Sequence, residues 1–235
     1  MTDEQKTKVR EVFESFLKRR AQKIRRLRFE DLEINPFLIR LMSKELDLMD
    51  ARSIVEWRVQ QHWERGLVTA FGFALQEVAK IFSEGTGVEG ADVLKIKNGR
   101  HYHIQVKSGP NTIPKDMAQR LTQLLQSAQR RNRGSVAMFG MCYGTPEQVS
   151  NIVEQYIEVD TIVGRTFWEF ISDDPNCIDE IYEIAAEISG NYEVEPGKTL
   201  KQLLVDKISE LQVEFETLYS TSGDNMWNQI LRRNS

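Results

Sequence analysis

The residue types best suited to chemistry lie on one short segment near the middle of the chain. Residues 100–108, RHYHIQVKS, alternate as a β-strand does, and one face of that strand carries His101, His103, Gln105 and Lys107. Asp92 lies near the start of the preceding alternating segment, across an Asn98-Gly99 turn. An acid, a polar oxygen ligand and a lysine on neighbouring strands can hold Mg²⁺ and steady an attacking hydroxide. The spacing alone also fits an ordinary amphipathic hairpin on a protein surface.

The two histidines of that strand suggest a rival chemistry. His101 and His103 have the side chains of general bases or of Zn²⁺ ligands. A third convincing ligand is lacking, because His62 belongs to a predicted helix. We therefore expect both histidines to pack within the hairpin or to contact phosphate. The opposite face of the strand is expected to lie against the core, with Tyr102, Ile104 and Val106.

Residues 87–116, GVEGADVLKIKNGRHYHIQVKSGPNTIPKD, resemble the catalytic motif of PD-(D/E)XK nucleases, especially type II restriction endonucleases. In that motif an Asp is followed, after a hairpin's length, by Glu-x-Lys or by its Gln-x-Lys variant. Asp92, Gln105 and Lys107 match these positions. Two later segments, MCYG (141–144) and GRTFWEFISDDP (164–175), are similar too, so that the resemblance covers residues 67–175.

The resemblance implies a Mg²⁺ site held by Asp92, Gln105 and the main-chain carbonyl of Val106, with Lys107 acting on the attacking water and on the developing charge. Gln105 departs from the commonest pattern, which has an acid there. Its amide adds no negative charge, so Mg²⁺ is expected to bind more weakly than at two carboxylates. Glu77, on the helix before the motif, is the first candidate to supply the missing charge, because related nucleases often carry an acid there. Glu89 and a substrate phosphate are the alternatives.

The elements around the motif indicate an α/β domain. An apolar helix at 67–83 precedes the hairpin, with Gly66 ending or bending the helix before it, and a second helix at 114–131 and an apolar strand at 135–144 follow. This order predicts a mixed β-sheet flanked by helices, in agreement with the PD-(D/E)XK core. The chain is mostly helical again after Pro146. We expect a helical N-terminal region for DNA binding or dimerisation (1–66), a nuclease core (67–175) and a helical C-terminal region packed on that core (176–235).

The composition of the 235 residues is that of an ordinary globular protein, with 40% hydrophobic and 28% charged side chains. No apolar stretch reaches the ~20 residues that cross a bilayer, and the charged N-terminus does not look like a signal peptide. The two cysteines, Cys142 and Cys177, are too few for a disulfide framework or a metal-thiolate set. We expect a soluble protein without a membrane partner, and by the resemblance one of the prokaryotic cytoplasm.

The net charge of −4 hides a strong asymmetry along the chain. Residues 1–146 carry 25 Lys and Arg against 17 Asp and Glu, whereas residues 147–220 carry 4 against 17. A positive half can hold nucleic acid even when the whole chain is acidic. Acidic helices that simply keep the C-terminal part in solution would produce the same asymmetry.

Two basic segments and one turn are the candidate DNA contacts. Residues 18–28, KRRAQKIRRLR, contain seven basic residues and no acid, and a second cluster ends the helix after the catalytic strand. We expect this second cluster to contact bases or backbone near the scissile site, although cations also favour a helix C-terminus for its dipole. The candidates are Arg19, Arg20, Arg25 and Arg26 in the first segment, Arg130, Arg131 and Arg133 in the second, and Ser108, Asn111 and Lys115 in the turn beside the lysine strand.

Together these features predict a type II restriction endonuclease that uses Mg²⁺ to cut both strands of a short specific sequence in double-stranded DNA. A symmetric DNA site is naturally met by a homodimer, and a cognate DNA methyltransferase is expected as a genetic rather than a physical partner. Two alternatives remain. One is a structure-specific or repair nuclease of the same fold, and the other is a DNA-binding protein in which Gln105 marks a decayed active site.

Overall fold

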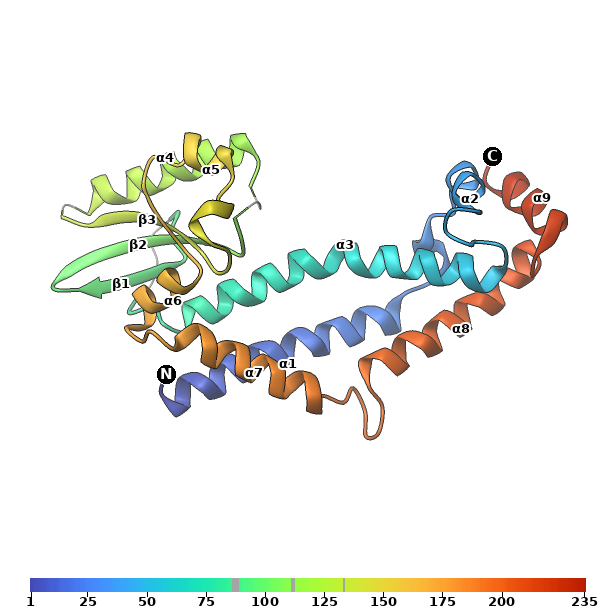
Figure 1. The fold of residues 1–235 in the computed structure, drawn as a ribbon, viewed down its shortest axis with the longest axis horizontal. Coiled ribbons are helices and arrows are strands. Elements are labelled where there is room, and N and C mark those ends of the chain that lie inside the picture. Colours follow the sequence, from blue (N-terminus) through green and yellow to red (C-terminus); the bar gives the residue numbers. More distant parts are fainter. Residues whose placement is uncertain (86–88, 111–112, 133) are drawn as a thin grey trace. The chain divides into compact units, whose positions relative to one another are not determined.

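The computed structural model describes residues 1–85, 89–110, 113–132 and 134–235 (Figure 1). The chain forms two compact units: unit 1 comprises Met1–Phe16 and Ala70–Asn191, and unit 2 comprises Leu17–Thr69 and Tyr192–Ser235. Two long helices, α1 (Asp3–Arg26) and α3 (Ala51–Lys80), each contribute residues to both units. For this reason both units are discontinuous in sequence.

Unit 1 contains a four-stranded mixed β-sheet in the order β1-β2-β3-β4, which confirms the predicted α/β class. β1 and β2 form an antiparallel hairpin, and β2, β3 and β4 are parallel neighbours. Asn98 and Gly99 join the hairpin with φ angles of 53° and 73°, the left-handed values that a two-residue turn of this kind requires. The strands are β1 (Val93–Lys97), β2 (Arg100–Lys107), β3 (Val136–Met141) and β4 (Asp160–Val163).

Helices cover both faces of the sheet (Figure 1). On one face α4 (Lys115–Arg131) and α5 (Asn151–Tyr156) form a buried cluster with Phe139 and Met141 of β3. On the other face α6 (Arg165–Ser172) lies against β3, and a Cβ on Gly140 would come within 2.5 Å of the Phe167 ring. Because Phe139 and Met141 are register partners of Gln105 and Lys107, α4 covers the polar face of β2. His103 and Gln105 of that face are therefore buried, whereas His101 is exposed and Lys107 is half-buried.

The strand β4 is an element that the sequence pattern did not predict. The chain after Pro146 was expected to be mostly helical, and it does contain the short helix η2 (Pro146–Gln148), α5, α6 and α7 (Cys177–Asn191). Between α5 and α6, however, four residues pair with β3. A strand of four residues has too little alternation to be detected, so its pairing partner decides its structure.

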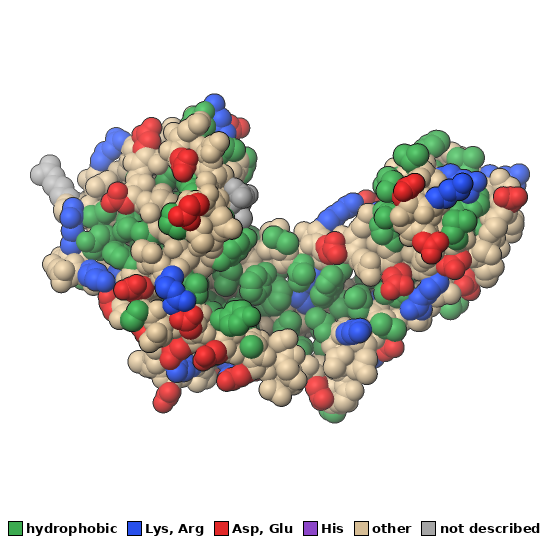
Figure 2. Space-filling view, in the orientation of Figure 1, with side chains coloured by type: hydrophobic (Ala, Val, Ile, Leu, Met, Phe, Trp, Pro, Cys, Tyr) green, Lys and Arg blue, Asp and Glu red, His purple; other side chains and the backbone are tan. Residues whose placement is uncertain are grey.

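The helix α3 runs for 30 residues and continues through Gly66, where a break or bend was expected. Its second half is the apolar helix predicted at 67–83, yet Val68 is 70% exposed and Phe73 is 63% exposed. Ala74, Val78 and Ala79 are buried. Hydrophobic side chains are also visible at the surface in Figure 2. Within the described chain, no helix combines the length and the apolar composition needed to cross a bilayer.

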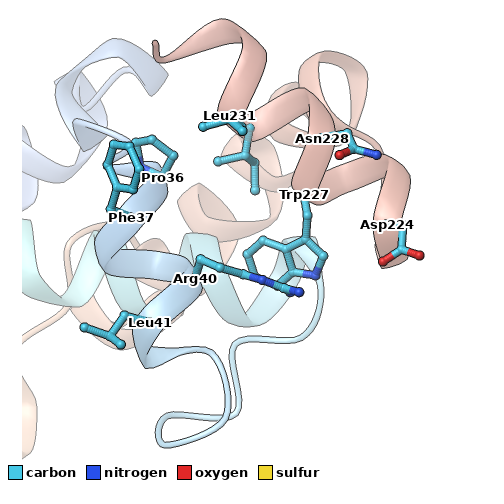
Figure 3. A pocket seen from close by; sticks show the side chains of 9 residues that line it. Pro36, Phe37, Arg40, Leu41, Asp224, Trp227, Asn228 and Leu231 are labelled. Atoms are coloured by element: carbon cyan, nitrogen blue, oxygen red, sulfur yellow. The ribbon is translucent and has the colours of Figure 1, made fainter.

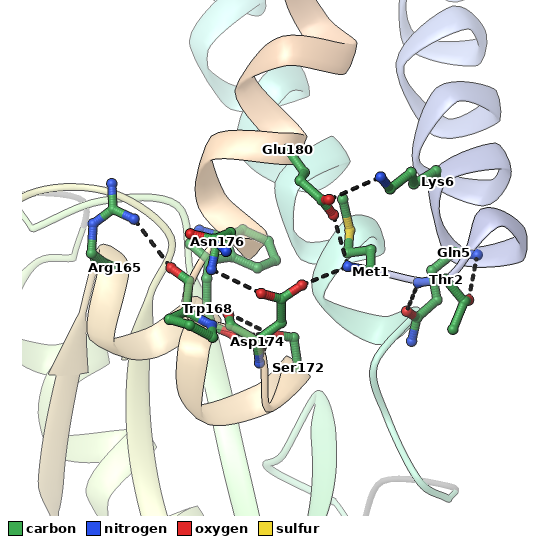
Figure 4. Close-up of polar contacts among 11 residues, drawn as sticks. Met1, Thr2, Gln5, Lys6, Arg165, Trp168, Ser172, Asp174, Asn176 and Glu180 are labelled. Atoms are coloured by element: carbon green, nitrogen blue, oxygen red, sulfur yellow. Dashed lines mark hydrogen bonds and ion pairs between the residues drawn. The ribbon is translucent and has the colours of Figure 1, made fainter.

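The first turns of α1 are tied to α7 within unit 1 by charged groups (Figure 4). The Met1 ammonium lies 2.5 Å from Asp174 Oδ2 and 2.7 Å from Glu180 Oε2. Lys6 Nζ lies 2.8 Å from the other oxygen of Glu180. The hydrogen bonds that the Met1 ammonium donates to both carboxylates raise its pKa, so this corner of the unit is held by paired charges.

Unit 2 is helical, and its core lies between the first turns of α3, the segment that precedes α3 and two C-terminal helices. The Asn35 side chain accepts a hydrogen bond from Leu38 N at 3.0 Å, as expected for a helix cap before Pro36. A groove of about 760 Å³ lies between α2 and α9, where the Arg40 guanidinium is 4.6 Å above the Trp227 ring (Figure 3). The helices not yet given are η1 (Phe29–Leu32), α2 (Pro36–Met42), α8 (Leu200–Tyr219) and α9 (Gly223–Arg233).

Candidate active site

The three residues of the sequence motif meet at the end of the hairpin that lies opposite its turn. Asp92 directly precedes β1, and its main-chain N–H donates to the carbonyl of Ile104 at 2.9 Å. Its carboxylate oxygen Oδ2 accepts hydrogen bonds from the side-chain Nε2 of Gln105 and from the main-chain N–H of Val106, the latter at 2.9 Å. Lys107 ends β2. The structure thus brings Asp92, Gln105, Val106 and Lys107 together.

The main chain of Val106 is satisfied by side chains at this point instead of by a neighbouring strand. β1 begins at Val93, opposite Ile104, so the last residues of β2 have no antiparallel neighbour. The N–H and C=O of Val106 point to that vacant side, because alternate residues of a strand direct these groups the same way. Asp92 accepts from the N–H, and Gln76 Nε2 of α3 donates to the carbonyl oxygen at 2.7 Å. Both main-chain polar groups of Val106 therefore have a partner, as buried main-chain groups of folded proteins require.

Burial sets the electrostatics of this region. Gln105 is only 8% exposed, and Asp92 and Lys107 are half-buried. Burial, with the nearby Asp92 charge as a smaller cause, raises the pKa of the Cys142 thiol, which therefore stays protonated. In the described part of the chain, the Lys107 ammonium forms no ion pair.

The histidines of β2 occupy different environments. His101 is exposed, whereas His103 is 3% exposed and lies on the face that α4 covers. Burial, and secondly the neighbouring His101, lowers the pKa of His103, so its imidazole is neutral at physiological pH. Among the described residues, no group of three or more His, Cys, Asp or Glu side chains could hold a metal ion. The surroundings of His103 are those of a packed hairpin residue.

The helix before the motif contacts the site through Gln76. Its neighbour Glu77 is 55% exposed, and its carboxylate lies 2.7 Å from Lys80 Nζ. Gln76 was not assigned a role from the sequence. One feature of the sequence indicates this contact of Gln76 with the strand. Gly72 lies four residues earlier on the same face of the helix, and a small residue lets a helix come close to its neighbour. A Cβ on Gly72 would lie 3.1 Å from Ser108 Oγ.

The donor atoms at this site suit a hard cation. Asp92 offers a carboxylate, Gln105 an amide oxygen and Val106 a carbonyl oxygen, which are the ligand types of Mg²⁺ and not those of Zn²⁺. Both hydrogen bonds to Asp92 fall on Oδ2, so Oδ1 is the oxygen that a cation would use. Glu89, the other candidate acid, is exposed and lies 3.6 Å from Arg131 Nη1. These three donors therefore fit Mg²⁺, and among them only Asp92 carries a negative charge.

The candidate DNA contacts of unit 1 lie at both ends of α4. Ser108 follows β2, and Lys115 Nζ lies 4.7 Å from the Tyr156 ring centroid at the start of the helix. Arg130 and Arg131 are exposed at the far end, roughly 22 Å along the helix at 1.5 Å per residue. They are therefore not beside Lys107, where contact with the scissile site was expected. Asn111 and Arg133 lie outside the described residues.

The basic segment of α1, a candidate DNA contact that could equally be a solvated helix face, contains both buried and exposed arginines. Arg20 is buried in unit 2, with its guanidinium 4.0 Å above the Trp63 ring and donating to the Trp63 carbonyl at 2.9 Å. Arg25 lies 2.8 Å from Glu195. Arg19 and Arg26 are exposed. Since Arg20 already has buried partners, its first role is to pack α1 against α3 within this unit.

Comparison with known proteins agrees with the motif. A search of curated proteins finds no match. The sequence model of one family, described as Type II restriction endonuclease EcoO109I, matches residues 3–189. The match covers most of the chain and includes α3, the hairpin with Asp92, Gln105 and Lys107, and α4. The chain therefore belongs to the family of type II restriction endonuclease EcoO109I.

Proposed function

We propose that the protein is a site-specific endonuclease that hydrolyses phosphodiester bonds in both strands of double-stranded DNA and requires Mg²⁺. The observation that carries this proposal is the assembly of Asp92, Gln105 and Lys107 around the free edge of β2. With the main-chain carbonyl of Val106, these residues offer three oxygen donors and a cation that has no ion pair among the described residues. Membership of a restriction endonuclease family supports DNA as the substrate.

In this proposal each residue has a distinct task. Asp92, the amide oxygen of Gln105 and the carbonyl of Val106 hold Mg²⁺. When bound, Mg²⁺ polarises the scissile phosphate and makes a water molecule more acidic. The Lys107 ammonium donates hydrogen bonds to that water and to the phosphate oxygens, where negative charge develops. Burial of Gln105 beneath α4 keeps the donor atoms in fixed positions.

DNA binding is assigned to basic side chains outside this cluster. The exposed residues Arg130, Arg131, Lys115 and Arg26 are the candidates, together with Ser108 beside Lys107. Such contacts to phosphates position the duplex and make binding depend on salt. A homodimer would place one active centre on each strand of a symmetric site. A cognate methyltransferase would protect the DNA of the host, a prokaryotic cell in whose cytoplasm the enzyme would act.

Digestion of a plasmid tests the proposal. The protein is incubated with supercoiled DNA with and without Mg²⁺, and the fragment ends are sequenced. Discrete fragments with one sequence at every end, formed only with Mg²⁺, are expected. Cleavage that follows DNA structure instead of sequence would favour a repair nuclease. Retained DNA binding without cleavage at any Mg²⁺ concentration would favour a DNA-binding protein with a decayed site.

A further inference from the structure

The α3 side chain that contacts the candidate active site is that of Gln76. We propose that Gln76 is a positioning residue for the cation site: its side-chain amide holds the carbonyl of Val106 in the orientation in which that oxygen binds Mg²⁺. The inference rests on the proposed function, because it concerns the same cation. It differs from the expectation for Glu77, in which the helix contributes a charge.

The first step is the geometry of the contact. Gln76 Nε2 lies 2.7 Å from Val106 O. A carbonyl oxygen only accepts, so the amide must present its NH₂ end to it. The Val106 N–H is fixed in the same way by Asp92, at 2.9 Å. The two peptide groups that flank the Val106 Cα are thus both held from outside the strand, one by an acid and one by an amide.

The second step is the approach of the helix. Gly72 lies one turn before Gln76, and a Cβ there would meet Ser108 Oγ at 3.1 Å and Ser108 Cβ at 3.3 Å. Gly72 and Gln76 therefore face consecutive parts of the same strand end, Ser108 and Val106. This close approach lets the Gln76 amide reach the strand. Glu77, turned about 100° from Gln76 around the helix, is exposed and pairs with Lys80.

The third step is the chemistry of a shared carbonyl. A carbonyl oxygen has two lone pairs, so one can accept from Gln76 while the other binds a cation. β1 begins only at Val93, so this carbonyl has no partner on that strand. Removal of Gln76 would therefore also remove its hydrogen-bond donor. The carbonyl could then turn toward other donors, and the cation would lose a preformed ligand. Groups that orient metal ligands typically change metal affinity by roughly 10–100-fold when they are removed.

The test compares Gln76→Met, which keeps the size of the side chain but removes the donor, with Gln155→Met, a matched change at an exposed position of α5. We expect Gln76→Met to raise the Mg²⁺ concentration for half-maximal plasmid cleavage by about tenfold. Saturating Mg²⁺ should restore most of the rate. Gln155→Met should behave like the unchanged protein. Circular dichroism and thermal melting check that both variants are folded.

A binding measurement makes the result independent of cleavage. Mg²⁺ is titrated by calorimetry into DNA complexes of two proteins, one with Lys107→Ala alone and one that also carries Gln76→Met. The protein with both changes should bind Mg²⁺ about tenfold more weakly. An unchanged affinity, or a rate loss that Mg²⁺ does not restore, would overturn the proposal. Gln76→Glu should also raise the Mg²⁺ requirement, and a lowered requirement would show that position 76 acts through charge. If the unchanged protein cuts no DNA, the proposed function fails, while the titration still decides the role of Gln76.

Discussion

The two ends of β2 differ in what satisfies the main chain. At the hairpin end, Arg100 to Ile104 pair with β1 through a regular antiparallel ladder. At the other end, the main chain of Val106 is satisfied by the side chains of Asp92 and Gln76. Within the ladder the neighbouring strand lies directly against the carbonyls that face it and leaves no space there for a ligand. The comparison suggests that the site lies where the ladder stops because only there can main-chain and side-chain oxygens be directed to one point.

The largest expected effect is a difference in cleavage rate between substitutions of the lysines at the two ends of the hairpin. Lys107→Ala should lower the cleavage rate by roughly 10³-fold, since the ammonium is proposed to stabilise charge in the transition state. DNA binding should persist, because affinity comes mainly from the basic side chains elsewhere. Lys97→Ala, which removes an exposed ion pair with Asp173 at the hairpin end, should leave cleavage unchanged. Rates and DNA affinities are measured for both variants, and near-normal cleavage by Lys107→Ala would remove the mechanism.

A second change tests the charge at the end of β2 that carries the candidate active site. Gln105→Glu places a new carboxylate beside Asp92, so without a cation the two charges repel and the melting temperature should fall. Mg²⁺ should restore the melting temperature, and the Mg²⁺ concentration for half-maximal cleavage should decrease by about tenfold, because a carboxylate binds the ion more strongly than an amide. Melting curves and cleavage rates over a Mg²⁺ series measure both effects. The same Mg²⁺ requirement in both proteins would exclude position 105 as a ligand.

The far end of α4 should matter for DNA affinity and not for chemistry. Arg130→Ala should reduce the slope of log affinity against log salt by about 0.9 if this arginine contacts one phosphate. The maximal rate at saturating DNA should stay unchanged, because Arg130 lies at the opposite end of α4 from Lys115. Gln123→Ala, an exposed position on the same helix, is the control. A loss of maximal rate in Arg130→Ala would place the scissile phosphate nearer to this end.

The smallest effect on function is expected at the hairpin turn. Gly99 has a φ of +73°, which an L-residue adopts at a cost of about 1–2 kcal/mol. Gly99→Ala should lower the free energy of unfolding by that amount and leave the Mg²⁺ dependence of cleavage unaltered. Urea unfolding measures the free energy of unfolding, and cleavage rates over a Mg²⁺ series measure the Mg²⁺ dependence. A changed Mg²⁺ dependence would mean that the two ends of β2 are coupled, contrary to the comparison.

Several features of unit 1 could be predicted because they are local. The Asn98-Gly99 turn and the alternation on each side of it place Asp92 opposite the end of β2, whatever packs around the hairpin. The helix at 115–131 is amphipathic enough to be recognised alone, and it forms α4. The strand β4, with four residues, has no such pattern. It forms because β3 offers it an unpaired edge.

What the sequence determined by itself is the set of reactive groups and their register: the acid, the amide and the lysine around one turn. Only the tertiary structure decided which side chains reach that set. Consecutive residues of a helix point about 100° apart, so a small rotation of α3 exchanges Gln76 for Glu77 at the strand edge. The same holds for Arg20, which points inward to Trp63 while the neighbouring Arg19 is exposed. Packing of a helix against its neighbours fixes that rotation, and it depends on residues far away in the chain.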